Sequence, residues 1–509
     1  MRPTDAVEKV CLVVRSESRE AISPILAVLT DFERQGVSYC YWKSSRRVVS
    51  VLNGEGDIDL LIEKHHQHRA EAVLLQQGFK RFPSVGWREH PAISSFLGFD
   101  EANGRLIHFH LHFCLIIGER ILKNYRIPWE RKLLDSAVAH PTLPIRILDP
   151  ASEAILLVVR ACLELRRLDP ITLRTWQAAI KKFALDRAEL AVRVDRRTLC
   201  ERACELMDEE AAEMVADAIY GRQKLETYRR LRRTIRAYFA PYRTYNGWEA
   251  RLRSAARVLL WTACTLNKRL LHLPRPWSRR VPGGGCVVAL IGVDGSGKTT
   301  VGTAIRAWLT AEIDVIPIYL GTGNGRPSLL LWPFKLMVPL IACTLGTKPK
   351  GASHGKISNR PAGPIYSMLL TVWAMVVAWE KRSKLLAARR GSDRGMVILT
   401  DRYPQNEIIG FNDGPLLARL IAVPLWLRRH EAAVYALARR LPPDLVIKLM
   451  VSPETAARRE PDMDPVVIRE RISELKRLAF PGARVVCVDA EQPLAEVIRV
   501  VKREVWREL

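Results

Sequence analysis

Residues 286–300, CVVALIGVDGSGKTT, combine glycines, a lysine and two threonines at the spacing of a loop that binds phosphate. Glycines let the backbone curl so that several amide N–H groups point at phosphate oxygens. The Lys298 ammonium adds a full charge toward the terminal phosphates, and the Thr299 hydroxyl is a ligand for Mg²⁺. The pattern therefore predicts that ATP and Mg²⁺ bind through residues of this loop: Gly292, Asp294, Gly295, Ser296, Gly297, Lys298, Thr299 and Thr300.

A second group of polar residues follows the apolar stretch MVIL at 396–399. Asp401 and Arg402 come at the end of that predicted strand, where ligand groups gather in an open parallel sheet. The Asp401 carboxylate is suited to hold Mg²⁺ through a bound water, and the forked donors of Arg402 can reach a phosphoryl oxygen. We therefore expect Lys298, Asp401 and Arg402 to be catalytic, with Thr299 and Asp401 beside the magnesium ion.

From about Gly285 to Leu509 the chain resembles the thymidylate kinase family of nucleoside monophosphate kinases. The resemblance is carried, in family order, by GVDGSGKTT, TDRY, PPDLVIKLMVSPETAARR and VVCVDAEQPLAEVIRVV. It implies a P-loop kinase fold and the reaction dTMP + ATP to dTDP + ADP, with Asp401 and Arg402 between the donor and acceptor phosphates. It also implies that Arg458 and Arg459 belong to a lid over the donor nucleotide, although a solvated helix face accounts for them equally simply.

Two departures from that family leave the phosphoryl acceptor open. After TDRY the chain reads PQNEIIGFNDG, where the family has residues that position the nucleotide base. It reads YLGTGNGRPS where the family has residues that bind the acceptor phosphate. Arg326 is a candidate replacement for the family's arginine that binds the acceptor phosphate. One alternative is a kinase for a phosphorylated sugar or another metabolite of surface-polysaccharide biosynthesis. Another is a nucleotide-binding switch or scaffold at a membrane assembly.

The N-terminal part of the chain carries a second group of candidate ligands. In GDIDLLI, Asp57 and Asp59 alternate on a predicted strand, so both carboxylates point to one face. The surrounding stretch resembles the nucleotidyltransferase fold, with residues 43–45 (KSS) at the position of its turn. That resemblance implies a carboxylate pair that shares a divalent cation with a triphosphate.

The third carboxylate of that fold is missing, and RLIHFHLHF offers His108, His110 and His112 in its place. Neutral imidazole suits Mn²⁺, Zn²⁺ or Fe²⁺ better than Mg²⁺, so a second divalent metal at Asp57, Asp59 and these histidines is one interpretation. The other is a polar strand face on which the histidines hydrogen-bond the two carboxylates without metal.

The chain divides into three predicted parts, whose helices and strands must position these residues. Residues 1–150 alternate short apolar runs with turns, which indicates a small α/β domain. Residues 151–280 read as a basic, amphipathic helical connector, ending in the Pro- and Gly-rich HLPRPWSRRVPGGG at 272–285. Residues 281–509 repeat strand, loop and helix, which predicts a parallel sheet with helices on both faces.

A formal charge of +25 indicates anionic partners. Besides the nucleotide substrate, an anionic membrane surface contacting residues 228–275 fits, with nucleic acid as the weaker alternative and a second copy of the chain as a homodimer partner. The other interpretation of residues 228–275 is an ordinary amphipathic helix that packs one domain on the other, with its arginines facing water. The charged opening MRPTDAVEKV does not read as a signal peptide, so we expect a cytoplasmic protein, peripheral at the membrane if those helices bind it. The apolar segments 336–347 and 365–379 are shorter than the roughly 20 residues that a spanning helix needs, which favours buried helices.

Overall fold

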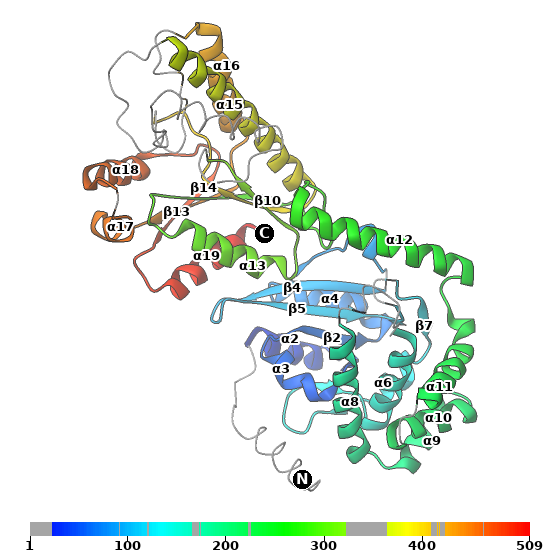
Figure 1. Cartoon of the computed structure of the whole chain (residues 1–509). Helices are drawn as coiled ribbons and strands as arrows, with labels where there is room; N and C mark the ends of the chain where they lie inside the picture. The colour runs from blue at the N-terminus through cyan, green and yellow to red at the C-terminus, as the bar shows by residue number, and fades with distance from the viewer. Residues whose placement is uncertain are drawn as a thin grey trace. The chain divides into compact units, whose positions relative to one another are not determined.

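The computed structural model divides the chain into two compact units, Met1–Leu266 and Asn267–Leu509 (Figure 1). It describes residues 23–90, 92–119, 122–164, 173, 175–221, 225–321, 364–408, 415, 417, 423–461 and 463–509. Arg326 and the apolar segment 336–347 lie outside the described residues. Each unit has its own sheet and is described by itself.

The C-terminal unit is built on a five-stranded parallel sheet with the order β11-β12-β10-β13-β14. Its central strand β10 is apolar and buried along nearly its whole length, as expected for a parallel strand covered on both faces. In the register of the sheet, Leu290 of β10 lies opposite Asp401 of β12, so the two strands end at the same edge. The strands are β10 (Cys286–Gly292), β11 (Val315–Tyr319), β12 (Val397–Asp401), β13 (Leu445–Met450) and β14 (Arg484–Asp489).

Helices cover both faces of this sheet (Figure 1). Helices α13 (Lys298–Thr310) and α19 (Leu494–Glu508) pack together on one face, and α15 (Pro364–Asp393) lies on the other. The predicted α/β class with a parallel sheet is therefore confirmed for this unit. The remaining helices are α16 (Leu425–Arg440), α17 (Pro453–Arg459) and α18 (Pro465–Arg477).

The N-terminal unit contains a seven-stranded mixed sheet with the order β3-β4-β5-β2-β1-β9-β8. Strands β2 (Asp57–Ile62) and β5 (Arg105–His112) are parallel neighbours at its centre. Successive residues of a strand point to opposite faces, so Ile58, Phe109 and Leu111 enter the core while Asp57, Asp59 and the three histidines face the other way. The other strands are β1 (Tyr39–Tyr41), β3 (Lys80–Arg81), β4 (Ile93–Asp100), β8 (Val138–Ala139) and β9 (Arg146–Ile147), with β6 (Leu115–Ile117) and β7 (Tyr125–Ile127) forming a separate pair.

Two helical layers complete the N-terminal unit. The apolar sides of α2 (Ser23–Arg34), α3 (Val48–Leu52) and α4 (Gln67–Gln76) share the core with Ile58 and Phe109. A second core joins Trp42 and Leu61 of the sheet region to the later helices. The predicted division at residue 150 stays a prediction, because these later helices belong to the same compact unit as the sheet. The helices that contribute to this core are α5 (Glu130–Asp135), α6 (Pro150–Glu164), α8 (Trp176–Arg193), α9 (Arg196–Leu206), α10 (Glu209–Tyr220) and α11 (Leu225–Tyr238), and α12 (Gly247–Leu266) follows them in the same unit.

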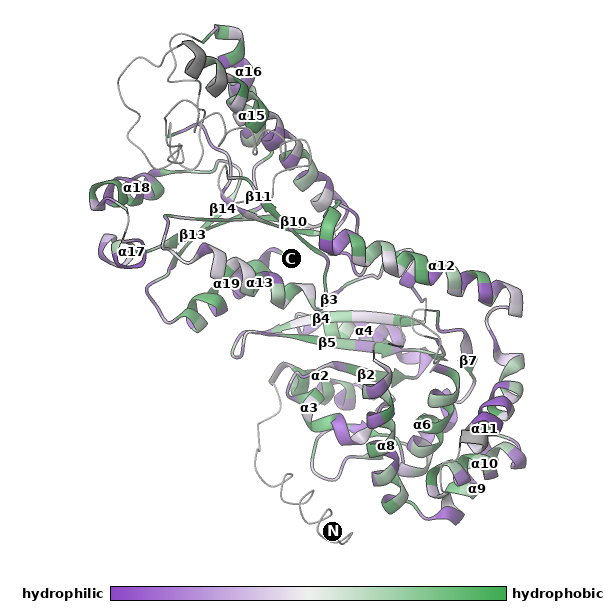
Figure 2. Ribbon diagram, in the orientation of Figure 1, coloured by the Kyte–Doolittle hydropathy of each residue, from purple (hydrophilic) through white to green (hydrophobic). Residues whose placement is uncertain are grey.

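Among the described residues, no helix has the length and the apolar run required to cross a membrane. The predicted buried helix at 365–379 falls within α15, which buries Ala374 and Val377 but exposes Trp379. Helix α12 alternates hydrophobic and hydrophilic residues along its length (Figure 2), and Trp248 and Leu259 are exposed. Contact of residues 228–275 with an anionic membrane stays a prediction.

Glu153 on α6 makes the stability of the N-terminal unit depend on pH. Its side chain is buried and accepts a hydrogen bond from the Ser45 backbone N–H at 2.8 Å. Burial raises the pKa of Glu153 to about 7, although the hydrogen bonds with Ser45 and the charge of Arg193 oppose the shift. Between the unfolded and the folded pKa of Glu153, the folded chain holds a proton on this carboxyl that the unfolded chain has lost. The unfolding free energy therefore falls as the pH rises through this range.

Replacing Glu153 by glutamine is expected to remove this loss. Gln keeps the acceptor for Ser45 and does not titrate, so the decrease in unfolding free energy between pH 5 and pH 8 should shrink by about 2 kcal/mol. Urea denaturation at the two pH values measures the change. An identical pH dependence in the Glu153→Gln variant and the natural chain would contradict the prediction.

Candidate functional site

The glycine-rich loop joins β10 to α13 in the C-terminal unit. Gly295 and Gly297 have φ angles of 80° and 87°, in the left-handed region that residues with a Cβ avoid. At Gly292, a Cβ atom would lie 2.4 Å from Ser296 Oγ. All three glycines are therefore needed for the turn that places the backbone N–H groups of the loop at the start of α13. A helix N-terminus of this kind favours a bound anion.

Lys298 is the first residue of α13, and its side chain is buried within the loop. Its Nζ donates hydrogen bonds to the carbonyl oxygens of Gly292 at 2.9 Å and Val293 at 2.8 Å, and lies 3.8 Å from Asp294 Oδ1. Burial lowers the pKa of Lys298, while the charges of Asp294 and Asp401 act in the opposite direction. An ammonium has three N–H donors, so two backbone bonds leave one for a phosphate oxygen.

The Asp294 carboxylate lies close to basic side chains from three separate elements. Besides Lys298, Arg402 Nη2 lies 3.4 Å from its Oδ1, and Arg471 Nη1 lies 3.2 Å from its Oδ2. Arg402 follows β12 with φ at 70°, and its backbone N–H donates to the Leu290 carbonyl of β10 at 3.1 Å. The sheet thus holds Arg402 beside the loop in a backbone conformation that non-glycine residues rarely adopt.

The predicted lid arginines differ in position. Arg459, the last residue of α17, donates from Nη1 to the Gly295 carbonyl at 3.1 Å and so contacts the loop. Arg458 instead donates from Nη2 to Thr455 Oγ1 at 3.3 Å, on its own helix. Arg471 on α18 also contacts the loop, through Asp294, although the sequence did not predict it as a lid arginine. The spacing of the arginines at 458, 459, 469 and 471 does not distinguish one from another.

The oxygen ligands expected for Mg²⁺ lie at the same edge of the sheet. Asp401 ends β12 opposite Leu290, and its charge opposes the lowering of the Lys298 pKa that burial causes. Thr299 and Thr300 form the exposed first turn of α13. A hydroxyl and a carboxylate are hard oxygen donors of the kind Mg²⁺ prefers, so these residues fit the metal by their chemistry.

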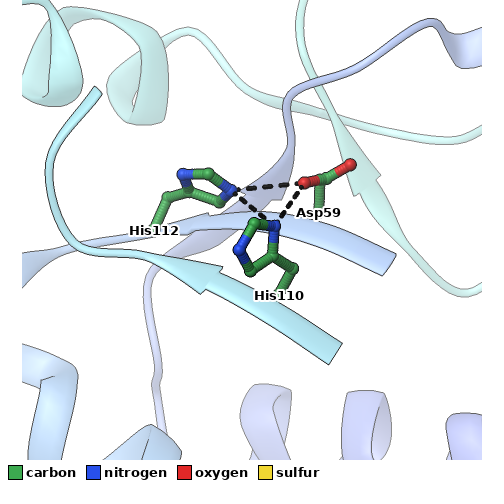
Figure 3. Close-up of side chains that lie close together, drawn as sticks. All are labelled: Asp59, His110 and His112. Atoms are coloured by element: carbon green, nitrogen blue, oxygen red, sulfur yellow. Dashed lines mark hydrogen bonds and ion pairs between the residues drawn. The ribbon is translucent and has the colours of Figure 1, made fainter. Parts of the chain in front are cut away.

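In the N-terminal unit, the sheet register places the predicted aspartates directly beside the histidines. Asp57 pairs with His108 and Asp59 with His110 across β2 and β5. His108 Nδ1 lies 2.7 Å from Asp57 Oδ1. Asp59 Oδ1 lies 3.0 Å from His110 Nδ1 and 3.2 Å from His112 Nε2, and those two nitrogens are 3.3 Å apart (Figure 3). We call Asp59, His110 and His112 the Asp-His-His triad.

Burial sets the protonation of the triad. It lowers the pKa of His110 to about 4 and that of His112 well below its usual value, although the Asp59 carboxylate opposes both shifts. Burial would raise the pKa of Asp59, but the charge of Lys43 and hydrogen bonds with both histidines hold that pKa well below its usual value. At neutral pH the triad therefore offers two uncharged imidazoles and one carboxylate.

Three basic side chains interact electrostatically with Asp59 of the triad, and we call Lys43, Lys123 and Arg160 the cationic cluster. Lys43 Nζ lies 3.8 Å from the centroid of the Trp42 ring, and the Arg160 guanidinium lies 5.2 Å from it. That ring packs edge-on against His112, with 4.9 Å between centroids. Burial and the charge of Arg160 lower the pKa of Lys43 to about 8, while Asp59 opposes. The sequence indicated only the turn at 43–45, because Lys123 and Arg160 lie far from Lys43 along the chain.

Comparison with known proteins gives relatives over somewhat less than half of the chain. No protein-family model matches the sequence. The uncharacterized ATP-binding protein YghS of Escherichia coli K12 is 30% identical over 225 residues, which are 43% of this chain and 92% of that protein. The uncharacterized ATP-binding protein YghR of the same strain is 26% identical over 238 residues, 45% of this chain and 89% of that protein. With its glycine-rich loop on a parallel sheet, the chain belongs to the same protein family as YghS.

Proposed function

We propose that the C-terminal unit binds ATP with Mg²⁺ and transfers the γ-phosphoryl group to an acceptor. The observation that carries this proposal is the convergence of Lys298, Arg402 and Arg471 on Asp294 at the glycine-rich loop. The relatives named as ATP-binding proteins support the choice of nucleotide. The resemblance to thymidylate kinases supports phosphoryl transfer rather than binding alone.

In this mechanism the loop and the start of α13 hold the phosphates through backbone N–H groups. The remaining N–H of Lys298 binds a phosphate oxygen of the transferred group. Arg402 is held to Asp294 by a long contact of 3.4 Å, so it can exchange that carboxylate for a phosphoryl oxygen. Thr299 and Asp401 would hold Mg²⁺, which neutralises phosphate charge when it is bound. Transfer is direct and in line, with no covalent intermediate on the protein.

The acceptor that the resemblance favours is dTMP, and a phosphorylated sugar or other metabolite is the second candidate. The second candidate gains support from the residues after Arg402. Gln405 is buried, and its amide binds the backbone of Ile408 through both Nε2 and Oε1, each at 2.8 Å. The Tyr403 hydroxyl donates to the Leu441 carbonyl. Both side chains are thus engaged within the protein instead of being directed toward a base.

The experiment that tests the proposal has two parts. Calorimetry with the full chain should show one ATP bound per chain in the presence of Mg²⁺. ADP release should then depend on an acceptor from a panel of nucleoside monophosphates and phosphosugars, with dTMP included. No heat of binding with ATP or GTP would overturn nucleotide binding. Binding without ADP release for any acceptor would overturn phosphoryl transfer and favour the switch or scaffold.

A further inference from the structure

We propose that the Asp-His-His triad binds a divalent transition-metal ion and that the cationic cluster holds a phosphate-bearing ligand against that ion. This second site belongs wholly to the N-terminal unit, and its test is independent of the nucleotide site at the glycine-rich loop.

Hydrogen bonding alone leaves one contact of the triad unfavourable. If both imidazole nitrogens carry hydrogens toward Asp59 Oδ1, the two N–H groups of His110 and His112 face each other at 3.3 Å. If one of them is unprotonated, its lone pair faces the carboxylate oxygen at 3.0 or 3.2 Å. A metal cation among the three atoms makes all three contacts favourable, because each atom then presents a lone pair to positive charge.

The dimensions of the triad fit such an ion. In complexes with bonds of about 2.1 Å, neighbouring ligand atoms are about 3.0 Å apart in octahedral and about 3.4 Å apart in tetrahedral geometry. The three separations of 3.0, 3.2 and 3.3 Å lie within this range. One ion can therefore contact Asp59, His110 and His112 with no movement of the strands. Two imidazoles and one carboxylate favour Zn²⁺, Fe²⁺ or Mn²⁺ over Mg²⁺.

The charges around the triad indicate what completes the coordination. The cationic cluster faces three carboxylates, those of Asp57, Asp59 and Glu164, the last of which pairs with Arg160 at 3.0 Å. Lys182 adds a further positive charge beside Arg160 and Glu164, so the carboxylates do not outnumber the cations. A divalent ion adds two more positive charges to this group. An anion must then accompany the metal for the site to remain near neutrality in a partly buried setting. A phosphate or pyrophosphate group fits, since Lys and Arg bind its oxygens and a metal accepts another.

Metal binding is tested with the full chain after chelation, in excess Mg²⁺ so that sites for hard cations are occupied. Calorimetry with Zn²⁺ and the visible absorption of Co²⁺ should each give one ion per chain. Asp59→Asn and His110→Gln should weaken binding at least about 10-fold. His140→Gln, a histidine outside the triad, should bind as the natural chain does. Circular dichroism of the metal-free variants checks that they are folded.

The ligand is tested with inorganic pyrophosphate as the probe. Adding it to the Co²⁺-loaded chain should shift the visible spectrum, and Lys43→Ala should weaken this response about 10-fold without removing the metal. Because the spectrum reports only the Co²⁺ ion, pyrophosphate bound at the glycine-rich loop does not contribute. Absence of stoichiometric metal, or unchanged metal affinity in both triad variants, overturns the metal site. A spectrum unaffected by pyrophosphate overturns the anionic ligand.

Discussion

Replacing Lys298 by alanine is expected to lower the affinity for ATP about 100-fold and to reduce phosphoryl transfer further, by about 10³-fold in kcat. The ammonium is buried and donates to two backbone carbonyls, which leaves its third N–H for the phosphates. Removing it deletes this charge from the proposed phosphate site, where Arg402 and the backbone N–H groups remain. Calorimetry and ADP release measure the two effects separately.

The matched control is Lys502→Ala on α19, which removes one lysine charge from the same unit. It should bind ATP as the natural chain does. A Lys298→Ala protein that is folded, by thermal melting, and that still transfers phosphoryl groups at the natural rate would contradict the assignment of the loop.

The second large effect is expected at Arg402. Arg402 is one of two arginines whose side chains contact Asp294. Its φ of 70° lies in a region that glycine adopts readily. Arg402→Gly should therefore relieve the backbone strain, worth about 1 kcal/mol, while it removes the guanidinium that we propose contacts the phosphoryl group. The variant should melt at the natural temperature or higher, yet lose about 10²- to 10³-fold in kcat.

Arg402→Ala separates the two contributions, because it removes the guanidinium but keeps the strain. It should show the same loss in kcat and melt at a lower temperature than Arg402→Gly. Arg499→Ala, on an exposed ion pair of α19, is the control and should change neither quantity by much. If both Arg402 variants keep the natural kcat at saturating ATP, the proposed role of this side chain is wrong.

Local contacts explain why the glycine-rich loop could be predicted. Lys298 binds carbonyls five and six residues away, and the left-handed conformations of Gly295 and Gly297 follow from residue type. The contact between Arg471 and Asp294 spans 177 positions and depends on how α18 packs, which no local pattern encodes. For this reason the sequence predicted Arg458 and Arg459 together, whereas the structure places Arg459 and Arg471 at the loop.

The same distinction holds in the N-terminal unit. Alternation along each strand predicted that Asp57 and Asp59 share a face, and that the three histidines share one. Only the parallel pairing of β2 with β5 decides that Asp59 meets His110 and His112, since a shift of one residue would turn either set to the opposite face. The sequence by itself therefore determined the glycine-rich loop and the candidate ligands, because short-range geometry fixes them. The tertiary structure decided which arginines, histidines and lysines meet, because those contacts depend on strand register and helix packing.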